Sequence, residues 1–434
     1  MVIRGVLPLA MLGLLVTGSS ADMPTQDLQF GGEVRLRAEG FDNALDLEDE
    51  GDSVAVSGGW ASRNDAYEYL RYRARIWMKA APREGLAMFF RVGNEYRFGR
   101  GENTSGVKDP ESKLSLDNAW AQISHRRMAL TFGRMDLQYG EGFLVFDGTP
   151  ADGSSSAWFD AIRLSVARPL GGVDLFFAQI DEEGFGGSSR DEDLFGVYAM
   201  QGWVETYILR RMKQQGTTST SGTPRPSGAT TAIGARLVRQ HRQGLSCAIE
   251  AAYQRGDVED VKREGYGGYG RIVWRGSGKR APGIELGGVY LTGDDPATDR
   301  YEGWDGFYAE WPKYSELLVY TLYDNTTRVV DATGVAWKGE PGTWTNMIAG
   351  WIEAGVNLLH GRLSARAFPV WAEEGGVGPG PGNERGLLLA AKLELPLGEG
   401  VHAQVLGEMF NPGDFYPPDA DHAYYGRWQL TAQF

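Results

Sequence analysis

The stretch that decides the fold is YLRYRARIWM, residues 69–78. Its three arginines occupy every second position, and tyrosine, alanine and isoleucine lie between them. The same two-residue period occurs in EVRLRAE, residues 33–39. This period predicts β-strands with charged groups on one face and apolar groups on the other. Many apolar positions are Ala, Gly, Tyr or Trp, with aromatics near strand ends, which is typical of a transmembrane barrel rather than a soluble sandwich.

Composition supports one large all-β unit. The chain has 434 residues, 61 of them glycine, and 12% are aromatic. It contains no run of 18 apolar residues, so the sequence predicts no transmembrane helix. A mean hydropathy of -0.34 also disfavours a helical membrane protein. It is compatible with a barrel, since only alternate strand residues face lipid.

Connections between these segments alternate between short and long. The predicted short ones are 80–85, 124–127, 168–172, 201–202, 241–244, 276–283, 360–361 and 397–400. The predicted long ones are 40–66, 98–113, 136–157, 182–192, 214–230, 256–264, 292–343, 373–384 and 411–422. Bacterial barrels have short periplasmic turns and long external loops, so the pattern predicts an antiparallel barrel of about 18 strands. Ser315–Tyr323 could add a strand but fits better as a short helix inside an external loop, and 16 strands is the alternative count.

Residues 1–21 read as a signal peptide, which leaves 22–434 as the barrel. Arg4 supplies a positive start, Val6–Val16 is an apolar segment too short to span a bilayer, and small residues end at Ala21. Cys247 is the only cysteine, so an internal disulfide framework and a cysteine-based zinc site are excluded. We therefore expect a bacterial outer-membrane location.

The last eight residues, RWQLTAQF, alternate as well. Trp428, Leu430, Ala432 and Phe434 share one face. A terminal phenylalanine closing such a strand resembles the signal by which outer-membrane barrels are recognised for assembly. An ordinary edge strand that stops at phenylalanine is the alternative.

Charge points to an anionic solute. The formal net charge is -14, which disfavours nucleic acid as a partner, and 34 of the 43 basic residues are arginine. Arginine at mid-membrane on the lipid face costs roughly 2–4 kcal/mol, so arginines of the alternating segments should face the lumen. This predicts lumen positions for Arg35, Arg37, Arg71, Arg73, Arg75, Arg91, Arg97, Arg163, Arg362, Arg366, Lys392 and Arg427, with Glu33, Glu39, Glu95, Glu353 and Glu394 beside them. The alternative is that these charges pair across neighbouring strands and only rigidify the wall.

Enzyme motifs are weak. The sequence has no Gly-x-Ser-x-Gly or His-Glu-x-x-His motif. A Gly-x-Gly-x-x-Gly match at Gly265, Gly267 and Gly270 lies in a strand-like segment with no helix after it, so we interpret it as a chance match. We expect no catalytic residue, no metal and no cofactor.

Several motifs resemble the alginate-export family of outer-membrane barrels. They are LTFGRMDLQYG at 130–140, WFDAIRL at 158–164, and a long-loop pattern containing Asp294, Asp295, Glu302, Trp304 and Asp305. The resemblance implies an 18-stranded monomeric barrel that exports a polyuronate through an electropositive constriction. Carried onto this chain, it implicates Arg71, Arg73, Arg134 and Arg163 as channel residues, with Asp136 and Asp160 as acidic partners.

The sequence therefore predicts an outer-membrane channel for anions, with an acidic polysaccharide as cargo. We expect it to lie in outer-membrane lipid as a monomer, with periplasmic export partners for such a cargo. A general or small-anion porin is the first alternative. An outer-membrane enzyme, or an adhesin acting through its long loops, is the second.

Overall fold

The computed structural model describes residues 27–44, 47, 67–100, 113–146, 159–180, 192–214, 216–217, 224–225, 227–241, 244–258, 261–310, 313–321, 328–330, 336–338, 344–358, 360–375, 378 and 380–434. The predicted signal peptide, residues 1–21, lies outside the described residues.

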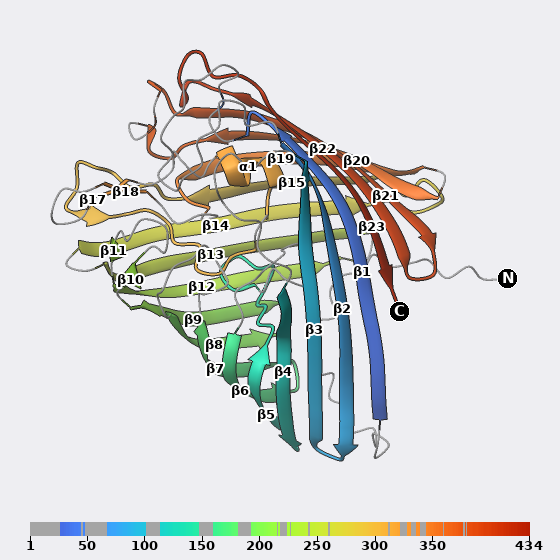
Figure 1. Cartoon of the computed structure of the whole chain (residues 1–434). Coiled ribbons are helices and arrows are strands. Elements are labelled where there is room, and N and C mark those ends of the chain that lie inside the picture. Colours follow the sequence, from blue (N-terminus) through green and yellow to red (C-terminus); the bar gives the residue numbers. More distant parts are fainter. Residues whose placement is uncertain are drawn as a thin grey trace.

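A single antiparallel sheet forms the wall of the molecule. Its long strands are β1 Asp27–Asp42, β2 Tyr67–Arg83, β3 Leu86–Arg100, β4 Lys113–His125, β5 Met128–Met135, β6 Phe159–Arg168, β7 Gly171–Ile180, β8 Glu192–Gln201, β9 Val204–Lys213, β12 Gly228–Gln240, β13 Leu245–Val258, β14 Val261–Arg275, β15 Gly283–Leu291, β19 Met347–Leu358, β20 Gly361–Trp371, β21 Glu384–Gly398, β22 Val401–Pro412 and β23 Ala423–Gln433. Each pairs with the next, and β1 pairs with β23, so 18 strands close into a barrel. Figure 1 shows β1, in blue, beside β23, in red.

Minor elements sit between the wall strands. They are β10 Gly216–Thr217, β11 Pro224–Arg225, β16 Arg300–Tyr301, α1 Glu316–Thr321, β17 Arg328–Val330 and β18 Ala336–Lys338. The pair β10 and β11 and the pair β17 and β18 form two small separate sheets, and β16 pairs in parallel with β14. Among the described residues, no helix has the length and apolar character needed to cross a membrane.

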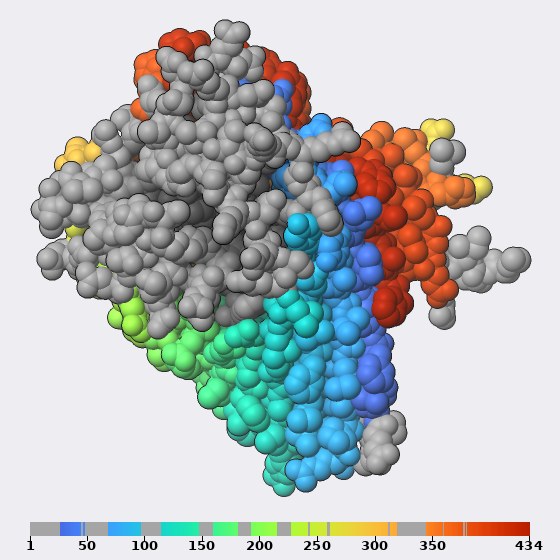
Figure 2. All heavy atoms as spheres, viewed as in Figure 1, coloured from blue at the N-terminus to red at the C-terminus, as the bar shows by residue number. Residues whose placement is uncertain are grey.

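Alternation along the strands separates two faces. In β1, Val34 is 51% exposed while Arg35 is 2% exposed. In β13, Ile249 is 56% exposed while Glu250 is 3% exposed. The exposed apolar side chains form the outer surface, whose β1–β4 part is visible as a continuous wall in Figure 2. An outward apolar band on a closed barrel is the arrangement that hydrocarbon requires, and it places this protein in a bacterial outer membrane.

The connections follow the predicted plan, with one error. The count of 18 strands is confirmed, so the alternative of 16 is wrong. Residues 315–323 contain α1, a short helix inside an external loop as expected. The predicted long connection at 256–264 is wrong, because β13 and β14 remain paired up to Val258 and Val261. Polar residues such as Asp257 and Lys262 suggested a loop, yet strands can project beyond the membrane and carry polar side chains there.

Loops cover the inner side of the wall. The loop after β5 begins at Asp136, and the loop after β15 runs from Thr292 to Asn346; we call them the β5 loop and the β15 loop. Their buried aromatic and aliphatic side chains form one core with inward-facing wall residues. The lumen is thus partly filled by folded chain.

Candidate channel lumen

Strands β1 to β4 hold a dense group of inward charges, which we call the β1–β4 cluster. It contains Arg35, Arg37, Arg71, Arg73, Arg75 and Arg91, together with Glu33, Glu39, Glu95, Asp117 and Asp136 at the start of the β5 loop. The first five arginines are at most 7% exposed. Their outward neighbours Val34, Leu36 and Ile76 are 38–60% exposed. The alternation of the sequence therefore predicted the inward orientation of this arginine set.

Acids from neighbouring strands pair with these arginines. Arg71 contacts Glu39 at 3.0 Å and Glu95 at 2.6 Å, and Arg73 contacts Glu33 at 2.5 Å. The acids lie on β1 and β3, on either side of the arginines of β2. The cluster thus combines both expectations, since its charges face inward and also pair across strands.

Arg91 joins this cluster to the β5 loop. Its guanidinium donates to Asp117 at 2.7 Å and to both carboxylate oxygens of Asp136, at 3.0 and 3.1 Å. Asn118 also donates to Asp136 at 2.7 Å. Asp136 is therefore an acidic partner inside the lumen, where it pairs with Arg91.

The β5 and β15 loops meet inside the barrel. Phe146 and Tyr308 lie on the two loops; the Phe146 amide donates to the Tyr308 carbonyl at 2.8 Å, and the Tyr308 amide donates to the Leu144 carbonyl at 2.9 Å. The Glu310 amide donates to the Gly142 carbonyl at 2.8 Å. These bonds make a short parallel pairing between two loops that leave the wall at distant strands. The pairing narrows the lumen.

Glu141 holds the β5 loop to the opposite wall. Its carboxylate accepts hydrogen bonds from Arg236 at 2.8 Å and from Arg271 at 2.7 and 2.9 Å. Burial by itself would raise the pKa of Glu141, but the hydrogen bonds and charges of Arg271 and Arg236 outweigh it and lower the pKa to about 2. Lys313 of the β15 loop donates to the Glu141 carbonyl. Glu141 therefore stays ionised throughout the physiological pH range, so its bonds continue to hold the crossing of the β5 and β15 loops (the loop crossing) to the wall.

Asp305 anchors the β15 loop. It is 2% exposed, pairs with Arg211, and contacts Arg263 at 3.0 Å. Gln254 also bonds its backbone, donating to the Asp305 carbonyl at 2.6 Å and accepting from its amide at 2.9 Å. Trp304 next to it stacks on Phe143 with ring centroids 5.1 Å apart. Two residues of the long-loop pattern are thus structural, and they fix the loop inside the lumen.

Gly267 explains one sequence motif. A Cβ at this position would lie 2.6 Å from the Trp304 ring, so glycine is needed for the loop to approach the wall. Gly265, Gly267 and Gly270 all lie within β14. The Gly-x-Gly-x-x-Gly match is therefore part of a strand, as interpreted from the sequence.

The other members of the long-loop pattern lie at its outer end. The Asp294 carboxylate accepts from the Glu302 amide at 3.1 Å, and the Asp295 carboxylate accepts from the Ala297 amide at 2.9 Å. Burial raises the pKa of Asp294 to about 6, and the charge of Glu302 adds to this effect. Asp294 is thus a loop carboxyl whose pKa lies close to neutral pH.

The remaining predicted basic residues are distributed along the lumen. Arg366 pairs with Glu353 at 2.8 Å and donates to the Tyr314 carbonyl of the β15 loop. Lys392 contacts Glu394 at 3.2 Å. Arg427 pairs with Glu316 of α1. Each has an acidic partner, and two of the three hold the β15 loop to the wall.

Arg163 and Arg362 make no ion pair with any carboxylate in the described part of the chain. Arg163 faces inward beside Tyr139 of the β5 loop, whose hydroxyl donates to Asp174 at 3.1 Å. Arg362 donates to the Ala281 carbonyl and the Asn357 side chain, both at 3.2 Å. The side chain of Arg97 is not among those described.

Arg134 and Asp160 do not face the lumen. They pair with each other through two bonds of 2.8 Å, but Arg134 shares its face of β5 with Leu130 and Phe132, which are 39% and 42% exposed. Asp160 likewise shares a face of β6 with Ile162, which is 55% exposed. The lumen positions implied by the family resemblance are therefore wrong for this pair.

Several lumen residues were missed from the sequence. Arg211, Arg236 and Arg271 lie at alternate, inward positions of β9, β12 and β14, and the period that identified Arg71 could have identified them too. Glu141 and Lys313 carry no such signal, because they lie on loops.

The barrel is similar to known structures along nearly its whole length. Pseudomonas aeruginosa OccK5 (OpdH) aligns with a TM-score of 0.58 and 10% identity, over 94% of this chain and 98% of that one. A BenF-like porin from Pseudomonas fluorescens Pf-5 aligns with a TM-score of 0.57 and 10% identity, over 94% and 98%. The fold is that of a porin. Acinetobacter baumannii OccAB4 gives a TM-score of 0.56 at 10% identity, over 95% of this chain and 100% of that chain.

No protein-family model and no curated protein matches the sequence. The structural similarities support an outer-membrane β-barrel and do not support the alginate-export family specifically. The first alternative from the sequence, a general or small-anion porin, fits these neighbours better than polysaccharide export does.

Proposed function

We propose that this porin barrel is a passive outer-membrane channel for small anionic solutes, with carboxylates as the preferred class. The observation that carries the proposal is the inward set of arginines in a closed barrel whose lumen is narrowed by two bonded loops. The proposal includes no chemical step and no cofactor, and it treats the barrel as a monomer.

Guanidinium groups suit such a pathway. They stay charged at any physiological pH and can bind a carboxylate through two parallel bonds. Most lumen arginines already have acidic partners, so a passing carboxylate competes for donors that are in use. That competition keeps each site weak enough to release the solute, which conduction requires.

The loop crossing favours small solutes over a polymer. Its backbone bonds and the ionised Glu141 contacts hold chain inside the lumen. A polyuronate, with one carboxylate per sugar, would use the same guanidinium groups but would also need these loops to separate. Polysaccharide export, with periplasmic partners, is thus the narrower form of the proposal and requires an additional opening step.

Conductance of the purified barrel in a planar bilayer tests the function. We expect the reversal potential in a KCl gradient to show anion preference, and small uronates to block the current more strongly than neutral sugars do. Reversing charge at Arg71 and Arg73 should move the reversal potential toward cation preference, because it removes two lumen cations and adds two anions.

Arg134→Gln is the matched control, since it removes a guanidinium on the outer face. It should leave the reversal potential as it is in the unmodified barrel. Unchanged selectivity in a folded Arg71→Glu/Arg73→Glu barrel would refute the anion pathway. Large currents that uronate oligomers block and monomers do not would favour the polymer form.

A further inference from the structure

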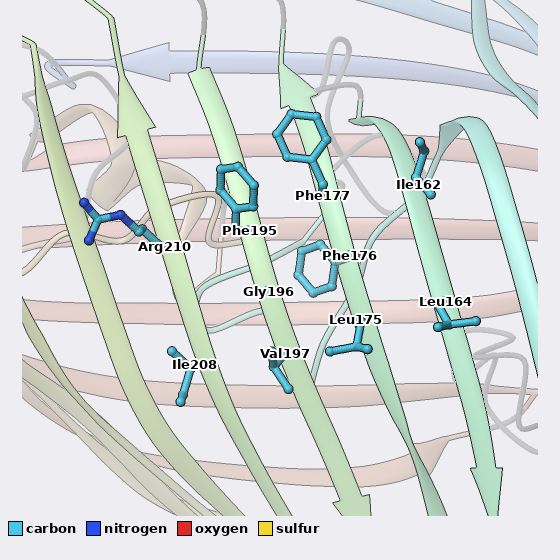
Figure 3. Close-up of a pocket in the computed structure, with 10 residues that line it drawn as sticks. All are labelled: Ile162, Leu164, Leu175, Phe176, Phe177, Phe195, Gly196, Val197, Ile208 and Arg210. Carbon is cyan, nitrogen blue, oxygen red and sulfur yellow. The ribbon is translucent and has the colours of Figure 1, made fainter.

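A shallow groove of about 480 Å³ lies on the outer face of β6 to β9. Its walls are Ile162, Leu164, Leu175, Phe177, Phe195 and Val197, all apolar. Figure 3 shows Arg210 at one side, level with Phe195 and above Ile208. The groove lies on the face that the barrel turns to lipid, outside the lumen.

Strand register shows where the apolar surface stops. Phe177, Phe195 and Arg210 are directly opposite one another on β7, β8 and β9. One step further toward the long loops, the outward positions of β6, β7 and β8 are Asp160, Gln179 and Asp193, and that of β9 is Met212. Arg210 therefore sits at the boundary between the apolar band and a polar row at the external end.

A second arginine completes the boundary. Arg210 is opposite Thr231 of β12, and Thr231 is opposite Arg255 of β13. Since neighbouring strands are about 4.8 Å apart, the two arginines are roughly 10 Å apart along the wall. Both are exposed, Arg210 donates to the Thr231 hydroxyl at 3.1 Å, and neither pairs with a carboxylate in the part of the chain that the structure describes.

We propose that this groove binds a phosphorylated, multiply acylated glucosamine lipid, the lipid A class of the outer leaflet. One acyl chain lies along the apolar groove, and a phosphate of the headgroup binds Arg210 and Arg255. Two exposed cations at the edge of a lipid-facing surface attract an anion at that depth, and phosphate accepts bidentate bonds from guanidinium. The external position selects the lipid of the outer leaflet. This inference is independent of what the channel transports.

Native mass spectrometry of the detergent-purified, full-length barrel tests the site with purified diphosphoryl lipid A. We expect one lipid to be retained, and the apparent Kd to rise about fivefold for each lost guanidinium, or about 25-fold for Arg210→Gln/Arg255→Gln. Dephosphorylated lipid A should bind the unmodified barrel as weakly as the phosphorylated lipid binds this double variant. Val197→Trp, which fills the groove and keeps both arginines, should also weaken retention.

Arg168→Gln/Arg239→Gln is the matched control. These arginines also lie on the outer face, but at the short-turn ends of β6 and β12, so retention of lipid A should be unchanged. Heat-modifiable migration on gels verifies that every variant is folded. Equal retention by the Arg210→Gln/Arg255→Gln barrel, or equal retention of phosphatidylglycerol and lipid A, would overturn the proposal, as would an unaffected Val197→Trp barrel.

Discussion

Arg163 differs from the paired arginines of the lumen, because it makes no ion pair with a carboxylate in the described part of the chain and instead lies beside the Tyr139 hydroxyl. Arg163→Gln therefore removes a positive charge without freeing an acid. A hydrogen bond to a charged group contributes about 1.5–3 kcal/mol, so block by a small uronate should weaken about tenfold or more. Current block at increasing uronate concentration measures this.

Arg366→Gln serves as the comparison. It removes a positive charge from the lumen and also leaves the negative charge of Glu353 without its arginine partner. In the Arg366→Gln barrel, the anion preference measured by reversal potential should fall by a larger factor than the block by uronate does. If uronate blocks the Arg163→Gln barrel as strongly as it blocks the unmodified barrel, Arg163 does not contact the solute.

Asp294 predicts a dependence on pH. Burial raises its pKa to about 6, so it is ionised at pH 7.5 and mostly neutral at pH 5. A raised carboxyl pKa means that the folded loop binds the proton more tightly than an unfolded one, so the loop gains stability as pH falls through 6. Loss of one negative charge near the mouth should make the channel more anion-selective between pH 7.5 and 5.

Reversal potentials across this pH range check the prediction. Asp294→Asn should show the low-pH selectivity at every pH, whereas Asp295→Asn should keep the pH step. Glu141 does not contribute to the step, because its pKa near 2 leaves it ionised throughout. A pH step that survives in Asp294→Asn would assign the titration to another group.

At the element scale, Asp305 is the buried acidic anchor of the β15 loop, in addition to the contacts that Arg366 and Arg427 make with this loop. Asp305→Ala removes the buried carboxylate that Arg211 and Arg263 share, and leaves Arg211 with the more distant Glu192 carboxylate, at 3.9 Å. Breaking a buried pair costs about 3–5 kcal/mol, which should loosen the part of the loop around Asp305 while the barrel stays closed. We expect larger single-channel conductance and more frequent current fluctuations.

The exposed Asp299→Ala change in the same loop is the control, and it should conduct like the unmodified barrel. A folded Asp305→Ala barrel with unchanged conductance would mean that the loop is held in place without this anchor.

Sequence alternation predicted the strands well and the loops poorly. The period of two placed Arg35 and Arg71 inward correctly. Lipid lies on one side of the wall and the lumen on the other, so apolar and charged side chains are separated onto opposite faces. The same period puts Arg134 outward with Leu130 and Phe132, and only the family resemblance suggested otherwise. Alternation is therefore the better guide where the two disagree.

Loop positions could not be predicted in this way. Glu141 meets Arg271 across 130 residues of sequence, and that contact exists only once the barrel has closed. Trp304 and Asp305 were assigned to a family pattern, but their spacing in the sequence did not indicate that they pack against β14. The lumen constriction is a property of tertiary structure.

The outer band makes a prediction for the whole molecule. Ile249 lies midway along the outward face of β13, so Ile249→Arg should destabilise the barrel in lipid by about 2–4 kcal/mol. Urea titration of folding into phosphatidylcholine vesicles measures this difference. Ser246→Arg, on the inward face of the same strand, should cost clearly less, and equal costs would contradict the assignment of the two faces.

Closure of the wall also limits how the molecule can assemble. Gln433 of β23 bonds to Glu33 of β1, a separation of 400 residues. Such a contact has a large loop-closure entropy and forms slowly. The seam between the two strands cannot form during synthesis or while the chain is still emerging into the periplasm. Closure must therefore wait until β23 is available, and until then the outward apolar side chains of the earlier strands need protection from water.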